Sequence, residues 1–321
     1  MCDLNYCGAL SLTIIVEHWL PHIFLEVSFR SNGIYGRNDR VSGNKRKELL
    51  FPPRAEMQGF PRREVLMKTL IIIPTYNEYE NLQPLLRSIF SYTPYSDILI
   101  VDDNSPDGTG ELADQLHGED SRVHVIHRAG KLGLGTAYVE GFKYAISNGY
   151  DAAFEMDADF SHDPQYLPDF LQAIEHADLV IGSRYIRGGA TPNWSLTRRF
   201  ISGCGNIFAR FMLGIPVHDC TAGYRCYRRE VLENIDLASI ESQGYAFQVE
   251  LAYRVMKQGF TIVETPIVFM DRRVGKSKMS RKIVAEAFLY VLRTRFGEQT
   301  PSDPSVPLES KQSDVVGPSV R

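Results

Sequence analysis

The sequence lacks the features of several protein classes. Its 321 residues contain only five cysteines, an odd number without the Cys-x-x-Cys spacing of a metal site. We therefore expect reduced thiols in a cytosolic setting and no disulfide framework. An excess of positive charge is also missing, since the formal net charge is -4. This balance argues against binding through bulk electrostatic attraction, and we predict no nucleic-acid partner.

The N-terminal part lacks an uninterrupted hydrophobic run that could span a bilayer. Its most apolar stretch, residues 10–29, is broken by two glutamates, two histidines and a proline. Residues 1–9 contain no Lys or Arg, so a secretory signal peptide is not predicted. We predict that residues 1–66 are a flexible N-terminal extension, or lie upstream of a true start at Met67. Residues 298–321 are polar and predict a disordered tail.

The middle of the chain alternates short β-branched runs with longer helical patterns. Strands are predicted at residues 69–73, 98–101, 123–126, 152–156, 179–181 and 224–227. Helices are predicted between them, around residues 82–89, 107–116, 135–147 and 164–174. The alternation is typical of an α/β fold with a doubly wound, mostly parallel sheet and helices on both faces. We predict one domain over residues 67–297, with the core of its sheet complete by residue 182.

Three polar clusters follow predicted strands, at residues 74–78, 102–107 and 157–159. Parallel sheets bind ligands beyond the carboxyl ends of their strands, where these clusters are expected to converge. Turn chemistry and helix capping, for instance by Asn77 and Asp107, could explain some of these polar residues. Capping does not explain the adjacent like charges of Asp102 and Asp103, which favour hydroxyl groups, base donors or a cation at this place.

The pair Asp157 and Asp159 comes directly after an apolar run. Oxygen ligands on a tight turn suit Mg²⁺ or Mn²⁺, and such an ion could bridge the two phosphates of a leaving nucleotide. Taken alone, an Asp-x-Asp turn is more often a solvated loop. The histidines His127, His162 and His218 lack metal-site spacing, and we interpret them as solvated or capping residues.

Seven stretches occur in an order that resembles the family 2 glycosyltransferases, and among them the polyprenyl-phosphate or dolichyl-phosphate mannose synthases. They lie at residues 73–78, 101–107, 131–135, 157–159, 182–185, 219–225 and 271–279. The resemblance runs from about Lys68 to Phe296. It implies a GT-A type fold and an enzyme that transfers mannose from GDP-mannose, with inversion, to a polyprenyl (dolichyl-type) monophosphate. It also implies Mg²⁺ or Mn²⁺ as the cofactor.

The resemblance assigns roles to individual residues. It implies a donor pocket for GDP-mannose made by Pro74, Tyr76, Glu78, Val101, Asp103, Asp157, Ala158 and Asp159. Asp157 and Asp159 would hold the metal, and Ser161 stands where some relatives place a glutamine ligand. The positions implied to contact the acceptor phosphate are Arg184, Arg198, Arg272 and Lys278. Asp159, Arg184 and Arg272 are the implied catalytic residues, although any single arginine could instead form a surface salt bridge.

A phosphate acceptor changes what the site requires. A polyprenyl monophosphate is largely ionised near neutral pH, so it needs no dedicated base. It needs cations that bring two sets of phosphates together, and arginine does this through paired contacts. Asp219 could bind a sugar hydroxyl, act as a base, or only hold the turn that precedes the strand at 224–227. The last role is at least as well supported as the others.

A lipid acceptor predicts contact with a membrane surface. Residues 198–213 and 276–295 combine apolar and basic side chains and could form interfacial helices, or could pack one face on the core. Many relatives carry C-terminal spanning helices, whereas this chain ends in a polar stretch. We expect a peripheral enzyme on the cytoplasmic face of a membrane, or one that uses a separate membrane-anchoring subunit. Two alternatives stay open: UDP-glucose or another nucleotide sugar as the donor, and a non-catalytic nucleotide-binding membrane-adaptor module.

Overall fold

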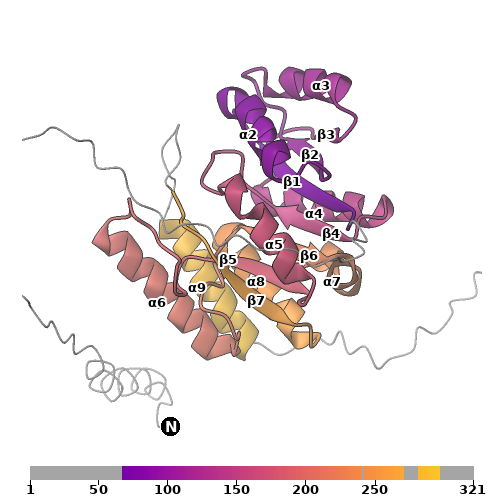
Figure 1. The fold of residues 1–321 in the computed structure, drawn as a ribbon. Helices are drawn as coiled ribbons and strands as arrows, with labels where there is room; N and C mark the ends of the chain where they lie inside the picture. The colour runs from indigo at the N-terminus through magenta and orange to yellow at the C-terminus, as the bar shows by residue number, and fades with distance from the viewer. Residues whose placement is uncertain (1–66, 241, 271–280, 297–321) are drawn as a thin grey trace, which may run out of the picture. The chain divides into compact units, whose positions relative to one another are not determined.

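The structure is a computed structural model that describes residues 67–240, 242–270 and 281–296, without the side chains of residues 281–284. The predicted extension over residues 1–66 and the predicted tail over 298–321 lie outside the described residues. Within these ranges, seven strands form one sheet in the order β3-β2-β1-β4-β6-β5-β7 (Figure 1). The strands are β1 Thr69–Thr75, β2 Asp97–Asp102, β3 Val123–His127, β4 Ala152–Glu155, β5 Leu179–Ser183, β6 Arg225–Arg228 and β7 Ile262–Pro266.

Helices cover both faces of the sheet because consecutive strand residues point in opposite directions. In β1, Ile71 and Ile73 pack on one side, and Leu70 and Ile72 pack on the other. The first side is covered by α2 Tyr79–Tyr92, α3 Thr109–Glu119 and α5 Leu167–Ile174, with the short 3-10 helix η1 Pro164–Tyr166 leading into α5. The second side is covered by α4 Leu134–Ser147, α6 Leu196–Leu213, α7 Arg229–Asn234, α8 Gly244–Lys257 and α9 Arg281–Phe296, with the short 3-10 helix η2 Leu237–Ser239 before α8. The predicted α/β class is confirmed.

The sheet is mostly parallel, as predicted, with one strand reversed. β1 pairs in parallel with β2 and β4, and β5 pairs in parallel with β7. β6 lies between β4 and β5 and is antiparallel to both. The expectation that the core of the sheet is complete by residue 182 is therefore wrong, because β6 and β7 follow later in the chain. Strand neighbours are set by hydrogen bonds between distant segments, which local patterns do not reveal.

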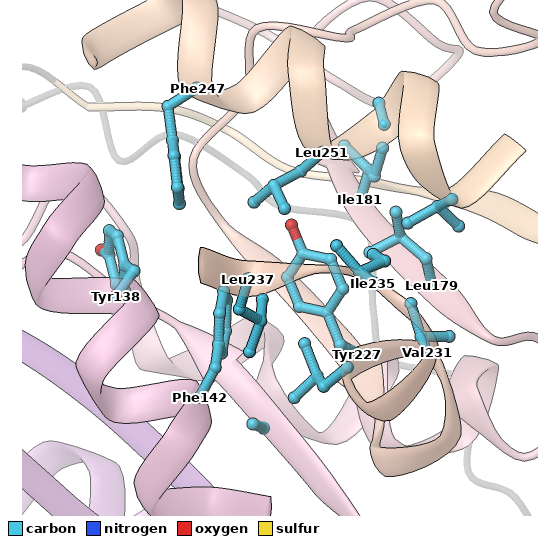
Figure 2. Packing of buried hydrophobic residues seen from close by; sticks show 14 of the residues in the cluster. Tyr138, Phe142, Leu179, Ile181, Tyr227, Val231, Ile235, Leu237, Phe247 and Leu251 are labelled. Carbon is cyan, nitrogen blue, oxygen red and sulfur yellow. The ribbon is translucent and has the colours of Figure 1, made fainter. Parts of the chain in front are cut away.

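Aromatic side chains join α4 and α8 above the sheet (Figure 2). The Tyr138 ring stacks on Phe247 with the ring centroids 6.3 Å apart, and Phe142 meets Tyr227 edge-on at 5.2 Å. Tyr138, Phe142, Tyr227 and Phe247 are all buried. Such pairs add to the stabilisation from buried area, and here they hold α4 against α8 and against β6.

Candidate active site

The predicted polar clusters meet at one edge of the sheet. β2, β1 and β4 are adjacent and parallel, so the loops after Thr75, Asp102 and Glu155 leave from the same edge. β4 and β5 are both antiparallel to β6, so the loop after Ser183 leaves from this edge too. The convergence expected from the sequence is confirmed by the topology.

The loops after β1, β2 and β4 each contain a non-glycine residue with positive φ. These are Asn77 at 62°, Asn104 at 56° and Phe160 at 63°. The left-handed region costs free energy for residues with a Cβ, most of all for a bulky residue such as phenylalanine. Backbone strain of this kind concentrates at functional sites, where the surrounding structure holds it. The positive φ angles therefore indicate the same edge of the sheet as the functional site.

Asp102 connects two of these loops. Its Oδ1 accepts hydrogen bonds from Thr75 Oγ1 at 2.9 Å and from Ser105 Oγ at 2.6 Å. Its Oδ2 accepts the Ser105 N–H at 3.0 Å, and the Asn77 N–H donates to Ser105 Oγ. Hydroxyl and amide groups of the protein therefore satisfy both carboxylate oxygens of Asp102. Of the two adjacent acids, only Asp103 has a buried oxygen that can still bind a ligand.

Asp103 is buried opposite Arg128, a residue that the sequence analysis missed. Asp103 Oδ1 lies 3.0 Å from Arg128 Nη1, but among the described residues this oxygen has no hydrogen bond of acceptable geometry. Burial raises the pKa of Asp103, although Arg128 acts in the opposite direction. A buried carboxylate oxygen without a hydrogen bond is suited to accept one from a ribose hydroxyl or a base N–H.

The other residues predicted for the nucleoside part of the donor pocket lie at the end of β2, at the end of β1 and in the loop after β1. Tyr76 is 36% exposed, and Lys131 Nζ lies 4.0 Å from its ring centroid, which joins the 131–135 loop to the loop after β1. Pro74 is half-buried, and Glu78 Oε2 accepts from Asn81 Nδ2. Val101 is fully buried, so its side chain belongs to the core beneath the site.

Neither residue of the capping interpretation is an N-cap, since Gly108 precedes α3 and Glu78 precedes α2, but the Asp107 side chain binds the start of both helices. Asp107 Oδ1 accepts the N–H of Thr109, the first residue of α3, and Oδ2 accepts the N–H of Tyr79, the first residue of α2. Asn77 does not cap α2, because Glu78 precedes this helix and the Asn77 N–H bonds to Ser105. Asp107 therefore fixes the starts of two helices at the site edge.

The Asp157-Ala158-Asp159 turn is held by groups on both sides. Tyr138 donates to Asp157 Oδ1 at 3.0 Å, and the Asp157 N–H donates to His162 Nδ1 at 2.9 Å. Asp159 Oδ1 accepts the Ser161 N–H at 2.9 Å, and Ala158, Asp159 and Ser161 are buried. Burial, together with Asp157, raises the pKa of Tyr138 well above its usual value, so this hydroxyl remains a donor.

His162 differs from its prediction as a solvated or capping residue. It is buried and stacks on Tyr224 with the ring centroids 4.8 Å apart. Nδ1 of His162 accepts an amide N–H and therefore carries no proton. Neutral His162 is thus the tautomer with its proton on Nε2. His162 and Tyr138 both act on Asp157, and neither carried a sequence signal beyond its residue type.

The carboxylate pair suits a small divalent cation. No group of three or more His, Cys, Asp or Glu side chains that could hold a metal is found within the described part of the chain. Mg²⁺ and Mn²⁺ sites in nucleotide enzymes commonly use one or two carboxylates and complete their shell with water and substrate phosphates. Asp157 and Asp159, two residues apart on one turn, fit this type of site.

Arg184 and Asp219 form a buried ion pair across the same edge. Asp219 Oδ2 accepts from the backbone N–H of Arg184 at 3.0 Å and from its Nε at 2.7 Å, and Oδ1 accepts from Nη2 at 2.7 Å. Thr221 Oγ1 also accepts from Nη2 at 2.9 Å. Asp219 is fully buried and also accepts from Thr221 Oγ1 in its own turn, so of its three predicted roles the structure favours holding this turn, to which it adds a hold on Arg184. Within the described residues, Arg184 Nη1 donates no hydrogen bond and can meet a phosphate.

Trp194 brings two of the predicted phosphate contacts together. The Arg184 guanidinium lies 5.1 Å and the Arg198 guanidinium 4.0 Å from the centroid of the Trp194 ring. Ser195 caps α6 by accepting the Arg198 N–H, which fixes the start of this helix. Arg272 and Lys278 lie outside the described residues. The described part of the site therefore has carboxylates at the ends of β2 and β4, and guanidinium groups after β5 and at the start of α6.

Comparisons with known proteins agree with this geometry. The family model described as "Glycosyl transferase family 2" matches residues 70–236. An undecaprenyl-phosphate mannosyltransferase of Micrococcus luteus is 52% identical over 227 residues, which cover 71% of this chain and 93% of the relative. A polyprenol monophosphomannose synthase of Mycolicibacterium smegmatis is 51% identical over 226 residues, covering 70% and 85%.

A solved structure shares the fold at low sequence identity. It is glucosyl-3-phosphoglycerate synthase from Mycobacterium tuberculosis, in complex with Mn²⁺, uridine diphosphate and phosphoglyceric acid. The match has a TM-score of 0.51 and 18% identity, and it covers 72% of this chain and 79% of that one. This likeness supports the GT-A type fold.

Proposed function

The chain belongs to glycosyl transferase family 2 and is a glycosyltransferase, and we propose that it transfers mannose from GDP-mannose to a polyprenyl (dolichyl-type) monophosphate. The observation that carries this proposal is 52% identity across 93% of an undecaprenyl-phosphate mannosyltransferase. The family membership confirms the resemblance drawn from the seven sequence stretches. It also rules out the reading as a non-catalytic adaptor module.

The site geometry fits a reaction between two phosphate-bearing substrates. An oxygen of the lipid phosphate attacks the anomeric carbon from the face opposite GDP, and the bond to the diphosphate oxygen breaks with its electron pair leaving on GDP. The acceptor is already ionised, so no residue has to remove its proton. Arg184 and Arg198, with Arg272 and Lys278 outside the described residues, would hold the acceptor phosphate, and Asp219 keeps the Arg184 fork in a fixed orientation.

Asp157 and Asp159 would hold Mg²⁺ or Mn²⁺ together with the diphosphate. A bound divalent ion neutralises the negative charge that develops on the departing GDP. Asp103 would accept from the nucleoside, and Tyr76 would offer an aromatic face. Tyr138 and His162 position Asp157 from its side chain and its backbone respectively.

An apolar hollow next to Arg184 fits the acceptor's isoprenoid chain. It has a volume of about 320 Å³ between α6, α8 and α9, and its apolar lining includes Ile201, Phe208, Val249 and Phe288. Thr221, which accepts a hydrogen bond from Arg184, also lines it. A chain attached to a phosphate at Arg184 can therefore leave the polar site along an apolar surface.

The outer face of α6 supports contact with a membrane surface. Leu196, Phe200, Ile207 and Phe211 are between 65% and 82% exposed, and Cys204 is exposed as well. These residues recur at helical spacing and form one stripe, called here the α6 stripe, with Arg199 and Arg210 on the same helix. A basic helix with an exposed apolar stripe suits the interface of a membrane that carries anionic lipids.

The second predicted interfacial helix has a different environment. α9 runs beside α6 (Figure 1), where Phe288 stacks on Phe208 at 4.6 Å, and Val291 of α9 is buried in the core. Among the described residues, no helix combines the length and apolar character needed to cross a bilayer. We propose peripheral attachment to the cytoplasmic face through the α6 stripe, with or without a separate membrane-anchoring subunit.

Cys204 gives a direct test of this attachment. We expect maleimide labelling of Cys204 in the full chain to slow severalfold when anionic phospholipid vesicles are added, because the α6 stripe enters the interface. Cys220 should stay unlabelled in the folded protein, since burial raises its pKa to about 12. Peptide mass spectrometry measures each site, and Cys204→Ser identifies the signal.

A matched pair of variants controls the vesicle test. Phe211→Ser should weaken vesicle binding in co-sedimentation, whereas Tyr95→Ser, which removes another exposed aromatic ring away from α6, should not. Equal labelling rates with and without vesicles, together with equal sedimentation of both variants, would refute the α6 stripe as the membrane contact.

Transfer itself is tested with purified full-length protein, a short polyprenyl phosphate, Mg²⁺ or Mn²⁺, and radiolabelled GDP-mannose or UDP-glucose. We expect an organic-phase product from GDP-mannose that depends on the metal. Product from UDP-glucose alone would replace the proposed donor with the alternative one. No product with either donor would contradict a polyprenyl-phosphate acceptor.

A further inference from the structure

Gln248 of α8 has a buried polar atom that the protein itself does not satisfy. Its side chain is almost fully buried, and its Nε2 donates to Glu155 Oε2 at 2.7 Å. Its Oε1 is also buried, but it has no hydrogen-bond partner among the described residues. Buried polar atoms in native proteins are nearly always paired, and an unpaired one calls for an explanation such as a ligand.

The orientation of the Gln248 amide is fixed from two directions. Glu155 is fully buried, and its other oxygen accepts from Tyr227 at 3.3 Å, so it holds the Nε2 end of the amide. Arg225 Nη1 donates to the main-chain oxygen of Gln248 at 2.8 Å and holds the backbone. Oε1 therefore points away from Glu155 in a set direction, as a preorganised binding group requires.

The absence of a side chain at Gly223 leaves space beside Gln248 and His162, called here the Gly223 recess. A Cβ added at Gly223 would lie 3.7 Å from Gln248 Nε2 and 3.5 Å from His162 Cε1, so these side chains flank the space above the glycine. Gly223 itself is half-buried. His162 in turn accepts the N–H of Asp157. The recess adjoins the place where the diphosphate would be held.

We propose that Gln248 binds the transferred sugar, with Oε1 accepting a hydrogen bond from one of its hydroxyl groups in the Gly223 recess. The inference rests on the proposed function, because it needs a sugar joined to a diphosphate at Asp157. An amide oxygen can only accept hydrogen bonds, and phosphate oxygens near neutral pH are acceptors as well. A sugar hydroxyl is a donor, and a sugar attached to the diphosphate comes within reach of this recess. Gln248 is then a residue by which the enzyme recognises its sugar.

The test compares nucleotide with nucleotide sugar in titration calorimetry of the full chain with Mn²⁺. In the wild type, GDP-mannose should bind more tightly than GDP. In Gln248→Met this advantage should shrink by about tenfold, the loss expected for one hydrogen bond to a buried acceptor, while GDP itself binds within about twofold of the wild type. Gly223→Ala should have a similar effect because its methyl group occupies the recess.

Gly223→Ala also guards against misfolding. It keeps every hydrogen bond of Gln248 and Glu155, and its new contacts are at ordinary van der Waals distance. Gly118→Ala, where a Cβ meets nothing within 4 Å, is the matched control and should bind both ligands like the wild type. Deoxymannose donors then identify the hydroxyl: one of them should lose affinity in the wild type but not in Gln248→Met.

The outcomes separate this inference from the proposed function. If the ratio of the affinities for GDP-mannose and GDP is the same in the wild type and in both variants, the proposed role of Gln248 is wrong, even if mannose transfer is intact. If Gln248→Met weakens the binding of Mn²⁺ together with GDP, Gln248 Oε1 acts on the metal, and the proposed sugar-binding role is wrong as well. If the wild type transfers no mannose, the proposed donor fails, and the same titration with UDP and UDP-glucose decides whether Gln248 binds a sugar.

Discussion

Asp159→Asn is expected to lower metal-dependent transfer by about 10³-fold. The replacement removes one of the two negative charges proposed to hold the cation, and a bound metal contributes several kcal/mol of transition-state stabilisation. The asparagine oxygen can still accept the Ser161 N–H that Asp159 Oδ1 accepts at 2.9 Å, so the turn should keep its shape. Initial rates over a range of Mn²⁺ concentrations measure the effect.

Asp169→Asn is the matched control for this experiment. Asp169 is an exposed residue in the first turn of α5, a short distance along the chain, and it belongs to none of the site contacts. Its variant should transfer mannose within about twofold of the wild type, as surface changes normally have small effects. Asp159→Asn protein that retains wild-type rates would remove Asp159 from the metal site and from catalysis.

Asp219→Ala is expected to destabilise the domain by about 3–5 kcal/mol. The change leaves the Arg184 guanidinium buried without the carboxylate that accepts two of its N–H groups and the Arg184 backbone N–H, and an uncompensated buried charge has a cost of this size. For a domain of this length the melting temperature should fall by roughly 10 °C. Differential scanning calorimetry and urea denaturation both measure the loss.

An exposed histidine–carboxylate contact of similar length provides the contrast. His127 Nε2 lies 2.8 Å from Asp114 Oδ1, but the two side chains are 49% and 61% exposed. Asp114→Ala should change the free energy of unfolding by less than about 1 kcal/mol, because water screens the pair. If both variants shift the melting temperature equally, burial is not what makes the Arg184–Asp219 pair important.

Many elements of this protein could be predicted from local patterns. The β-branched runs predicted the first five strands to within two residues of their observed ends, because strand residues with both faces covered are apolar without interruption. The polar clusters after β1, β2 and β4 could be recognised because each directly follows an apolar strand and differs from it in polarity. β7 was not predicted: it is a short edge strand whose residues are mostly half-buried, so it carries little apolar signal.

The contacts that complete the site could not be predicted in this way. Arg128 was missed, although it faces Asp103, and Trp194 was missed, although it lies against two of the predicted arginines. A single arginine or tryptophan in a loop has no pattern that distinguishes it from a surface residue. Asp219 was recognised as a candidate residue. Whether it is a base or a structural residue could not be decided, because that depends on its contact with Arg184, 35 residues away.

The sequence by itself determined the α/β class, the edge of the sheet at which the acidic clusters gather, and the family of the enzyme. These follow from periodicity and from motifs, which are properties of neighbouring residues. Tertiary structure alone decided that β6 enters the sheet in reverse between β4 and β5, that Asp219 holds Arg184, and that Gln248 meets Glu155 from 93 residues away. Such pairs depend on strand register and helix packing, which form only when distant segments exclude water together.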